Sequence, residues 1–373
     1  QGRRAVLEAD AAVVGSGLPA ILAALELARR GASVVVVGEA DASPRGLGLA
    51  LLGPGRPYRT VADAIGRAAA RLVWAAGCEN QLRLKAFVEA ATQDLGYRAA
   101  GSFLLARTRE EAEALEESED MLRADGFPGE FLDHYMLETR FDLSGFPGGY
   151  WAAGDAEVDA LLLHEAARQA ARDARVAFRV SRVHGLHAEL SGVRLDLEQG
   201  SLRVAAAVVA SDASGAELVP ELAPLVRPSA SARLALSPLA GATLPSVART
   251  ADGQLAWRTN DGSVLLAETA FFEGAESGVS LRDLATRLPL DLASATSGQE
   301  PAELSLDGLP VVGLLEPRPL AVACGFSGLA PGFAFAAARW VADALLRGTD
   351  PTPEALRATR APPSRLSAAG RSQ

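Results

Sequence analysis

The sequence encodes an acidic protein that is too long for one ordinary hydrophobic core. It has 373 residues, of which 49% are hydrophobic, and a formal net charge of -10. This length predicts two domains, which can interleave along the chain. Nucleic-acid binding needs a basic surface to neutralise phosphates, so the charge argues against a nucleic-acid partner and also against acidic partners.

Cysteine and histidine usage indicates neither disulfides nor a metal site. Cys78 and Cys324 are far apart and lack CxxC spacing, which fits a reducing cytoplasm. The histidines have no acid or cysteine at ligand spacing, so we expect surface or structural roles for His134, His164, His184 and His187. No apolar run reaches the roughly 18 residues of a membrane span, and the first residues do not resemble a secretory signal.

The first forty residues predict a strand, a helix and a second strand. Residues 5–14 are rich in alanine and β-branched side chains and end at a glycine, as a buried strand does. Residues 19–30 have apolar side chains at helical spacing and stop at Gly31. The run SVVVVG (33–38) predicts another buried strand, and a βαβ unit of this kind implies a parallel sheet.

The rest of the chain alternates between helical and strand-like patterns. Residues 58–125 are mostly helical and include a strongly acidic helix at 109–126. A loop at 145–154 carries Tyr150 and Trp151, and a helix and three strand-like runs follow to residue 211. Residues 216–304 read as short antiparallel strands, with a hairpin turn at 260–262. A strand at 320–324, a helix ending at Gly348 and a linker-like tail at 349–373 complete the chain.

The turn between the first strand and helix carries a dinucleotide fingerprint. Residues 15–20 fit G-x-G-x-x-A: the first glycine makes a tight turn, the second lets the backbone approach a diphosphate, and the small last residue lets helix and strand pack. Amides at the helix start would hold the phosphates. The motif comprises Gly15, Ser16, Gly17, Leu18, Pro19 and Ala20. A purely structural βαβ turn is the alternative.

The acid that normally ends the second strand and binds the ribose is displaced by one position. Gly38 stands at the expected place and Glu39 follows it. Because side chains alternate along a strand, Glu39 would point away from the ribose unless the chain bulges or the strand has already ended. We expect Glu39 to be a ribose ligand, with a solvent-exposed acid as the alternative.

Beyond this fingerprint, the chain resembles FAD-dependent oxidoreductases of the D-amino-acid oxidase and glycine oxidase superfamily, D-arginine dehydrogenase-like members in particular. The likeness covers nearly the whole length. It rests on residues 13–39, ASPRGLG (42–48), FRVSRVHGL (178–186) before AAVVASDASG, and most specifically on DGLPVVG, LAVACGFSG and GFAF within 307–335. It implies noncovalent FAD and a fold of class α/β, with a discontinuous Rossmann-like FAD-binding domain and an α+β substrate domain with an antiparallel sheet.

The resemblance also implies further cofactor residues. A segment along the diphosphate and flavin would contain Ser43, Arg45 and Gly46, and the backbone of Val183 would touch the adenine. A glycine-rich turn at the pyrimidine end of the flavin would contain Gly325, Phe326, Ser327, Gly328, Gly332 and Phe333, where helix-start amides stabilise negative charge. A simple polar loop at 43–45 and core packing of the two phenylalanines are the alternatives.

Several family features are missing from this chain. Gln299, Glu300 and Pro301 stand where relatives often carry a carboxylate-binding arginine, which a glutamate cannot replace. Ala256 takes the place of an expected active-site tyrosine, and Ala330 and Pro331 lengthen the C-terminal turn. Sarcosine-oxidase-like relatives use a lysine above the flavin for oxygen chemistry. Lys85 lies in the wrong segment for this, so a dehydrogenase is favoured over an oxidase.

The sequence therefore predicts an FAD-dependent dehydrogenase that oxidises an amine or amino-acid-like substrate. Arg258 is the candidate substrate anchor and Tyr150 or Trp151 the pocket lining, although Arg258 could instead be an exposed hairpin charge. The alternative is a flavin-binding subunit or degenerate homologue that acts within a complex. An NAD-dependent enzyme would leave the C-terminal turn unexplained. We expect the FAD-binding domain at 1–75, 150–215 and 305–348, the substrate domain at 76–149 and 216–304, and a separate electron acceptor or partner subunit.

Overall fold

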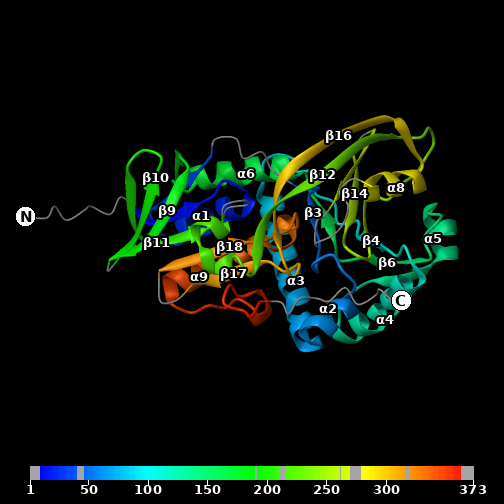
Figure 1. Ribbon diagram of the computed structural model, residues 1–373, viewed down its shortest axis with the longest axis horizontal. Coiled ribbons are helices and arrows are strands. Elements are labelled where there is room, and N and C mark those ends of the chain that lie inside the picture. The colour runs from blue at the N-terminus through cyan, green and yellow to red at the C-terminus, as the bar shows by residue number, and fades with distance from the viewer. Residues whose placement is uncertain are drawn as a thin grey trace, which may run out of the picture.

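The computed structural model describes residues 9–39, 46–189, 191–210, 215–260, 262–268, 279–315 and 319–362 (Figure 1). Within these ranges the chain forms two eight-stranded sheets, called here the first and the second sheet, and a pair formed by β3 (Leu49–Ala50) and β7 (Ala156–Glu157). One sheet is mainly parallel and the other mainly antiparallel. The predicted α/β class is thus confirmed.

The first sheet contains the predicted βαβ unit. Its parallel strands are β1 (Ala9–Val14), β2 (Val34–Gly38), β8 (Ala177–Val180), β11 (Ser201–Val209) and β18 (Leu320–Cys324), in the order β18-β11-β1-β2-β8. Antiparallel pairing adds β17 (Val311–Leu314), β9 (Val183–Glu189) and β10 (Gly192–Leu197). The central strands are apolar on both faces because both faces are covered.

Helices with many alanines cover one face of the first sheet. α1 (Leu18–Arg29), α3 (Arg67–Ala90), α6 (Ala160–Asp173) and α9 (Ala330–Arg347) share one apolar cluster with alternate strand residues. Small side chains let these helices approach closely. The opposite face packs against β9, β10, α7 (Gly215–Leu218) and a short 3-10 turn, η1 (Pro220–Leu222).

The second sheet has two different faces. Its order is β16-β12-β15-β14-β13-β4-β6-β5, with strands β4 (Ser102–Leu105), β5 (Glu130–Asp133), β6 (Gly148–Ala152), β12 (Val226–Pro238), β13 (Val247–Thr250), β14 (Leu255–Asn260), β15 (Ser263–Glu268) and β16 (Leu290–Ser305). The outer face packs around fully buried Trp257 with α5 (His134–Phe141) and α8 (Val279–Arg287). The inner face presents two rows by strand register, Tyr150-Leu104-Arg249-Ala256-Ala267 and Ala152-Ser102-Val247-Arg258-Leu265.

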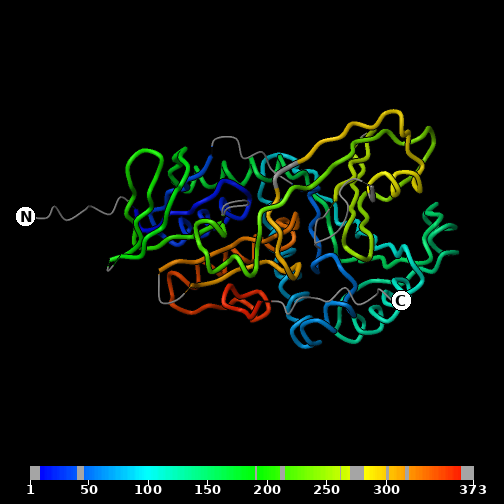
Figure 2. The backbone as a smooth tube through the Cα atoms, in the orientation of Figure 1, coloured from blue at the N-terminus to red at the C-terminus, as the bar shows by residue number. Residues whose placement is uncertain are grey.

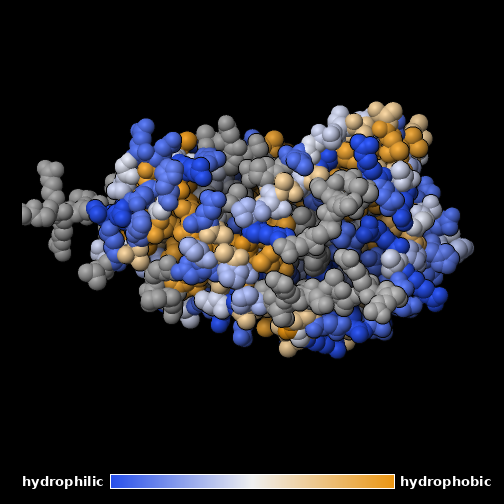
Figure 3. Space-filling model, viewed as in Figure 1, coloured by the Kyte–Doolittle hydropathy of each residue, from blue (hydrophilic) through white to orange (hydrophobic). Residues whose placement is uncertain are grey.

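Strands β12 and β16 link the two halves of the molecule. They pair antiparallel from Val226 opposite Ser305 to Pro238 opposite Leu290. In Figure 2 they run side by side from the first sheet to the far end of the second. Apolar surface gathers near their tip in Figure 3, where Leu239 and Leu292 are about half exposed.

Two helices and the C-terminal segment complete the described chain. α2 (Tyr58–Ile65) packs on α4 (Arg109–Asp125), the predicted acidic helix, which begins after the Thr108 cap and ends at left-handed Gly126. Residues 349–362, the first part of the expected tail, lie on the fold through η2 (Glu354–Leu356), and Arg360 pairs with Asp307. None of the helices described here is both long and apolar enough to cross a bilayer.

Candidate functional site

The predicted cofactor residues gather at one edge of the first sheet. The parallel strands β1, β2, β8 and β18 end at Val14, Gly38, Val180 and Cys324, so the residues after them meet at the carboxyl edge. The strand order reverses between β1 and β11, because β2 and β8 lie to one side and β18 to the other. Open α/β sheets bind their ligands at such a reversal.

The glycine turn after β1 has the geometry of an anion site. Gly15 has φ 128°, which favours glycine, and Gly17 precedes α1 with φ -72° and ψ 173°. Pro19 lies in the first turn of α1, and no side chain within the described ranges caps this helix. The first backbone N–H groups are therefore available to a phosphate, and the helix dipole favours negative charge there. Pro19 and Ala20 are buried against the sheet.

His164 braces this turn, a role that sequence reasoning missed. Its Nε2 lies 2.8 Å from the carbonyl oxygen of Ser16, and the side chain is buried on α6. A carbonyl only accepts hydrogen bonds, so Nε2 carries a proton here. The histidine thus fixes the middle of the dinucleotide motif from a neighbouring helix; the sequence predicted a surface or structural role for it but not this contact.

The displaced acid follows directly from the end of β2. The strand ends at Gly38, and Glu39 is exposed just beyond it, so strand alternation no longer dictates its direction. A Cβ on Gly38 would lie 3.0 Å from the carbonyl carbon of Gly15, so glycine gives the first turn room. Ser181 donates its N–H to the Gly38 oxygen at 3.1 Å, which places the start of β9, at Val183, near Glu39.

Residues 46–55 form a segment, called here the cradle segment. Its backbone closely approaches the C-terminal turn, α9 and α3. A Cβ on Gly46 would lie 3.2 Å from the Gly328 oxygen, and one on Gly332 would lie 2.8 Å from the Leu51 oxygen. A Cβ on Gly77 of α3 would lie only 1.9 Å from the Leu52 oxygen. Gly46 and the predicted C-terminal turn are therefore brought together, whereas Ser43 and Arg45 lie outside the described residues.

The C-terminal turn is held in a left-handed conformation by buried polar contacts. Gly325, Ser327 and Gly328 have φ of 65°, 50° and 79°. Gly325 donates its N–H to Glu303 Oε2 at 2.7 Å, and the N–H of Ser305 donates to Ser327 Oγ at 3.0 Å. A non-glycine residue in this region carries strain, which is typical of functional sites. No pattern in the sequence indicated that Glu303 would support this turn.

The two predicted phenylalanines and a missed asparagine support the helix after the turn. Phe326 and Phe333 are buried in the core beside α1 and α3, as the core alternative requires. Fully buried Asn80 donates to the Pro331 oxygen at 2.7 Å and accepts from the Phe335 N–H at 2.9 Å. It thereby ties backbone groups in the first turns of α9 to α3.

Arg258 is a buried clamp. It is 6% exposed, so the alternative of an exposed hairpin charge is wrong. Its Nη1 donates to the carbonyl oxygens of Leu47 at 3.1 Å and Val158 at 2.5 Å, and its Nε lies 3.1 Å from Glu157 Oε2. The guanidinium therefore joins the second sheet to the cradle segment, and these contacts occupy the groups that the sequence assigned to a substrate.

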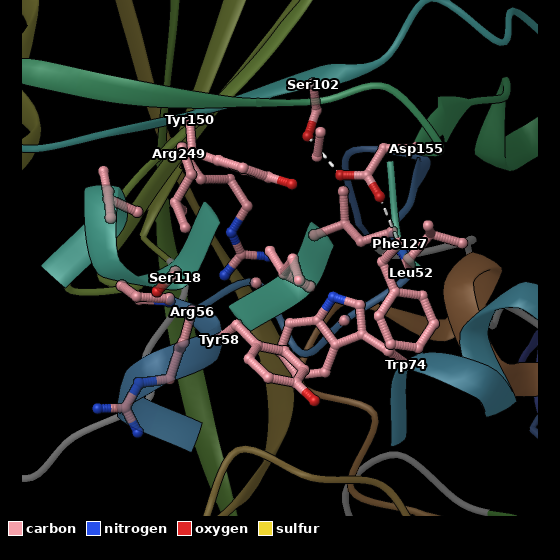
Figure 4. Close-up of a pocket in the computed structure, with 18 of the residues that line it drawn as sticks. Leu52, Arg56, Tyr58, Trp74, Ser102, Ser118, Phe127, Tyr150, Asp155 and Arg249 are labelled. Atoms are coloured by element: carbon pink, nitrogen blue, oxygen red, sulfur yellow. Dashed lines mark hydrogen bonds between the residues drawn. The ribbon is translucent and has the colours of Figure 1, made fainter. Parts of the chain in front are cut away.

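A cavity lies between the inner face of the second sheet, the cradle segment, and α2, α3 and α4 (Figure 4). Tyr150 and Arg249 belong to one inner-face row, in which Leu104 lies between them, whereas Trp151 points to the outer face. Aromatic side chains form the opposite wall, where the rings of Tyr58 and Trp74 pack edge to face with their centroids 4.7 Å apart. The sequence placed Arg258, Tyr150 and Trp151 in the pocket. The structure describes all three, and of these only Tyr150 lines this cavity.

Burial changes the electrostatics of the cavity. Burial raises the pKa of Asp155 to about 6, although its carboxylate accepts from Ser102 Oγ at 2.6 Å and from the Leu52 N–H at 2.8 Å. Burial also lowers the pKa of Arg249 to about 10, against the attraction of Asp155 and Asp252. Arg249 stays protonated at neutral pH, so the cavity combines a buried cation with a carboxyl that titrates near pH 6.

Two other features of the sequence, Lys85 and Cys324, lie on α3 and at the end of β18. Lys85 is exposed on α3 and lies 3.9 Å from Glu89. Cys324 is buried in β18 before the C-terminal turn. No cluster of histidine, cysteine and acidic side chains that could hold a metal ion occurs in the part of the chain that the structure describes.

Comparisons with known proteins agree with this geometry. The family model for FAD dependent oxidoreductases matches residues 10–344. The fold is similar to glycine oxidase from Geobacillus kaustophilus, with 23% identity, a TM-score of 0.72, and 91% of this chain and 95% of that chain covered. L-proline dehydrogenase from P. horikoshii has 17% identity and a TM-score of 0.72, covering 93% and 96%. Iminodiacetate oxidase from Chelativorans sp. BNC1 has 18% identity and a TM-score of 0.72, covering 93% and 98%. No curated protein sequence matches the chain.

Proposed function

The chain belongs to the family of FAD-dependent oxidoreductases, and we propose that it oxidises an amine or an amino-acid-like small molecule, as a dehydrogenase rather than an oxidase. Bound FAD supplies the acceptor for the substrate hydride, while the protein supplies binding and orientation. The observation that carries the proposal is the meeting of two glycine turns at one sheet edge, joined through the cradle segment to a cavity under the second sheet.

The residues at the sheet edge fit FAD because the start of α1 offers uncapped backbone donors and glycines bring the backbone segments close together. Residues 15–20 would hold the diphosphate with the open amides of α1. Glu39 would bind the ribose and Val183 the adenine. The flavin end would lie between Gly46 and the turn at 325–333, with Ser43 and Arg45 part of the same expectation. The division into an FAD-binding part and a substrate part along the predicted boundaries also belongs to this proposal.

The residues around the cradle segment would orient the reacting groups and exclude water. Asp155 binds the Leu52 N–H and Arg258 binds the Leu47 oxygen, so buried polar groups fix this backbone at two points. Leu47, Leu49 and Leu51 pack against an apolar stretch of the inner face that includes Val247, Ala256 and Ala267. An apolar, rigid wall of this kind keeps solvent away and holds a bound molecule in one orientation.

A dehydrogenase is favoured because the only lysine of the sequence is exposed and lies next to an acid on α3. Lys85 is exposed on α3, far along the chain from the turns at the sheet edge. The similar structures are named both as oxidases and as a dehydrogenase, so the choice rests on this chain's own residues. The narrower likeness to D-arginine dehydrogenases and a cytoplasmic location, inferred from the cysteine usage, remain part of the proposal.

A second function, a flavin-binding subunit without catalysis, is favoured by two observations on the inner face. The guanidinium of Arg258 is engaged by Glu157 and two carbonyl oxygens, and Ala256 leaves its place on the inner face without a polar group. Such a chain would keep the cofactor and would either transfer electrons to a partner or support that partner structurally.

Anaerobic mixing of the FAD-loaded protein with a panel of amines and amino acids separates these readings. An enzyme would lose the yellow flavin colour with at least one member, and a dehydrogenase would then regain it faster with an artificial acceptor than with oxygen. Fast recovery in oxygen would identify an oxidase. A flavin that dithionite reduces but no substrate bleaches would support the subunit and contradict the enzyme.

A further inference from the structure

A hollow of the size of a small organic molecule lies where the C-terminal segment meets α2 and the start of α3. Its volume is about 600 Å³, which is typical of pockets that hold such molecules. Its walls come from α2, the start of α3, residues 307–309 and residues 354–362. In Figure 1 the red end of the described chain lies beside α3, in agreement with the contacts between α3 and η2. None of the described residues that line the hollow is one of the predicted cofactor residues.

Arg360 fixes the wall that the C-terminal segment forms. Its Nε and Nη2 donate to the two carboxylate oxygens of Asp307 at 2.8 and 2.9 Å, and its Nη1 donates to the Pro310 oxygen at 3.0 Å. The Ala358 N–H also donates to the Val312 oxygen at 2.8 Å. The hollow therefore lies between elements that are already held together, so a ligand would not have to order the chain in order to bind.

The hollow has a local excess of positive charge in a protein whose net charge is -10. Its lining contains three arginines and two acids, which are Arg56, Arg357, Arg360, Asp307 and Glu354. The pair of Arg360 and Asp307 cancels one charge of each sign. Two arginines then remain against Glu354, which is exposed and therefore screened by solvent. This balance favours an anionic ligand over a cationic one.

Arg357 is the residue that can hold the anionic group. It is half-buried, and its Nε donates to the Thr352 oxygen at 3.0 Å. Within the described ranges, its Nη1 and Nη2 have neither a carbonyl nor a carboxylate partner. A guanidinium held through Nε presents these two nitrogens as a planar fork, which suits an oxyanion. Arg56 is attracted by Asp252 and has a further contact of its own, so we assign to it only a contribution of charge.

Apolar side chains form most of the remaining lining. α2 contributes Val61 and Ile65, and the segment before β17 contributes Leu309. The other apolar positions are occupied by small residues, which leave the volume open: Ala64, Ala69, Ala355, Ala361 and Pro362. A ligand that uses both parts of the lining has an apolar body and one acidic group.

We propose that this hollow binds a small organic anion with an apolar body. Its acidic group pairs with Arg357, and its body packs against Val61, Ile65 and Leu309. The site is separate from the oxidation proposed above. The ligand would contact residues 307–309, which lead into β17 and its partner strand β18. Occupancy would therefore stabilise the strand pair that precedes the C-terminal turn.

A calorimetric titration of the FAD-loaded full chain with naphthalenesulfonate and with naphthalenesulfonamide, its neutral counterpart, tests the proposal. The wild-type protein should bind one sulfonate per chain, about tenfold more tightly than the sulfonamide, because a charged hydrogen bond adds to the shared apolar contact. Added salt should weaken binding of the sulfonate and leave binding of the sulfonamide unchanged. Equal affinities, or several weak sites per chain, would overturn the proposal.

Substitutions separate Arg357 from the other charges of the chain. Arg357→Gln should reduce the preference to about one, whereas Arg357→Lys keeps the charge and should keep part of the preference. Arg347→Gln is the matched control, because the Arg347 side chain is 72% exposed and lies 3.5 Å from Asp343 on α9. Ala69→Trp, which fills the hollow from α3, should abolish binding of both probes. A preference that survives Arg357→Gln, that falls equally in Arg347→Gln, or that persists in Ala69→Trp would contradict the assignment.

Two further measurements identify the place where the probe binds. Flavin occupancy should stay unchanged during the titration, and displacement of FAD by the sulfonate would place the probe at the cofactor site and overturn the proposal. A chain shortened after Pro362 should bind the sulfonate as the full chain does. Binding that appears only after this shortening would mean that the end of the chain itself occupies the hollow, which would also overturn it. If Arg357→Gln does not fold, the wild type, Arg357→Lys and Ala69→Trp still decide the question.

Discussion

The carboxyl edge of the first sheet and the inner face of the second sheet are built in different ways. At the edge, backbone groups form the site, because glycine turns and uncapped amides follow the ends of parallel strands. At the inner face, buried charged side chains form the site: Arg249 and Arg258 lie on β13 and β14, and Asp155 lies in the turn after β6. A backbone site needs a sequence motif, whereas a side-chain site needs a particular strand register. The two regions therefore differ in how they tolerate substitution.

Where the two regions meet, the largest effect is expected at Gly48. Gly48→Ala would place a Cβ 1.9 Å from the Val158 oxygen, and both the overlap and the φ of 73° oppose it. We expect a loss of about 4 kcal/mol in unfolding free energy and weaker FAD retention. Gly241→Ala is the matched control, since Gly241 has φ 80° and nothing within 4 Å. It should lose only about 1 kcal/mol in a denaturant titration, and equal losses in both variants would refute the close-packing argument.

The buried clamp ranks next. Arg258→Met would leave Glu157 in the core without the nearer of its two arginines, and two carbonyl oxygens would lose a donor. A loss of about 3–5 kcal/mol in unfolding free energy is expected. Arg98 pairs with the same carboxylate but has a side chain that is 58% exposed, so Arg98→Gln should cost less than about 1 kcal/mol. Similar unfolding midpoints for the two variants would show that burial of Arg258 is not what matters.

Asp155 should make stability depend on pH. Its folded pKa of about 6 exceeds the ordinary value of 3.8, chiefly because it is buried. The folded state therefore keeps this proton to higher pH than the unfolded state, and the stability present below about pH 4 is lost as the pH rises through 6. About two pKa units correspond to at most about 3 kcal/mol. The stability difference between wild type and Asp155→Asn, measured from pH 4 to 7, should fall across this range, and a constant difference would contradict the assignment.

The smallest effect is expected at Glu39. This side chain is exposed beyond the end of β2, so a hydrogen bond to the ribose would be shared with solvent. Glu39→Ala should weaken FAD binding by about fivefold, or roughly 1 kcal/mol, without changing the unfolding temperature. Flavin fluorescence titration of the apoprotein gives the affinity. An unchanged affinity would mean that Glu39 is the solvent-exposed acid of the alternative interpretation.

The sequence predicted the edge of the first sheet better than the inner face of the second sheet, because a backbone site depends on local motifs and a side-chain site depends on strand register. The turn at 15–20, the helix after it and the strand before Gly325 depend on local patterns of glycine and apolar residues. Arg249 and Arg258 face inward only because β13 and β14 pair in one register, which no local pattern specifies. A charged residue inside an otherwise apolar strand, as in SVART (246–250), was the one signal that could have drawn attention to Arg249.

Supporting residues were missed for a related reason. Asn80, His164 and Glu303 each bond backbone groups that lie more than twenty residues away in the sequence. A single buried polar residue in a helix or strand does not reveal such a partner. The strand end at Gly38 also required the structure, because it is the boundary of β2 that frees Glu39.

The central claim, that the turn at 15–20 holds the diphosphate of FAD, is tested most directly by titrating the apoprotein with FAD in the wild type and in Gly17→Val. Gly17 has φ -72°, which valine adopts freely, so this variant should fold with an unchanged unfolding temperature and fail only by blocking the ligand. The account predicts one noncovalently bound FAD per wild-type chain and at least a hundredfold weaker binding in Gly17→Val. Equal binding in both proteins, or a wild type that takes up no FAD, would contradict it.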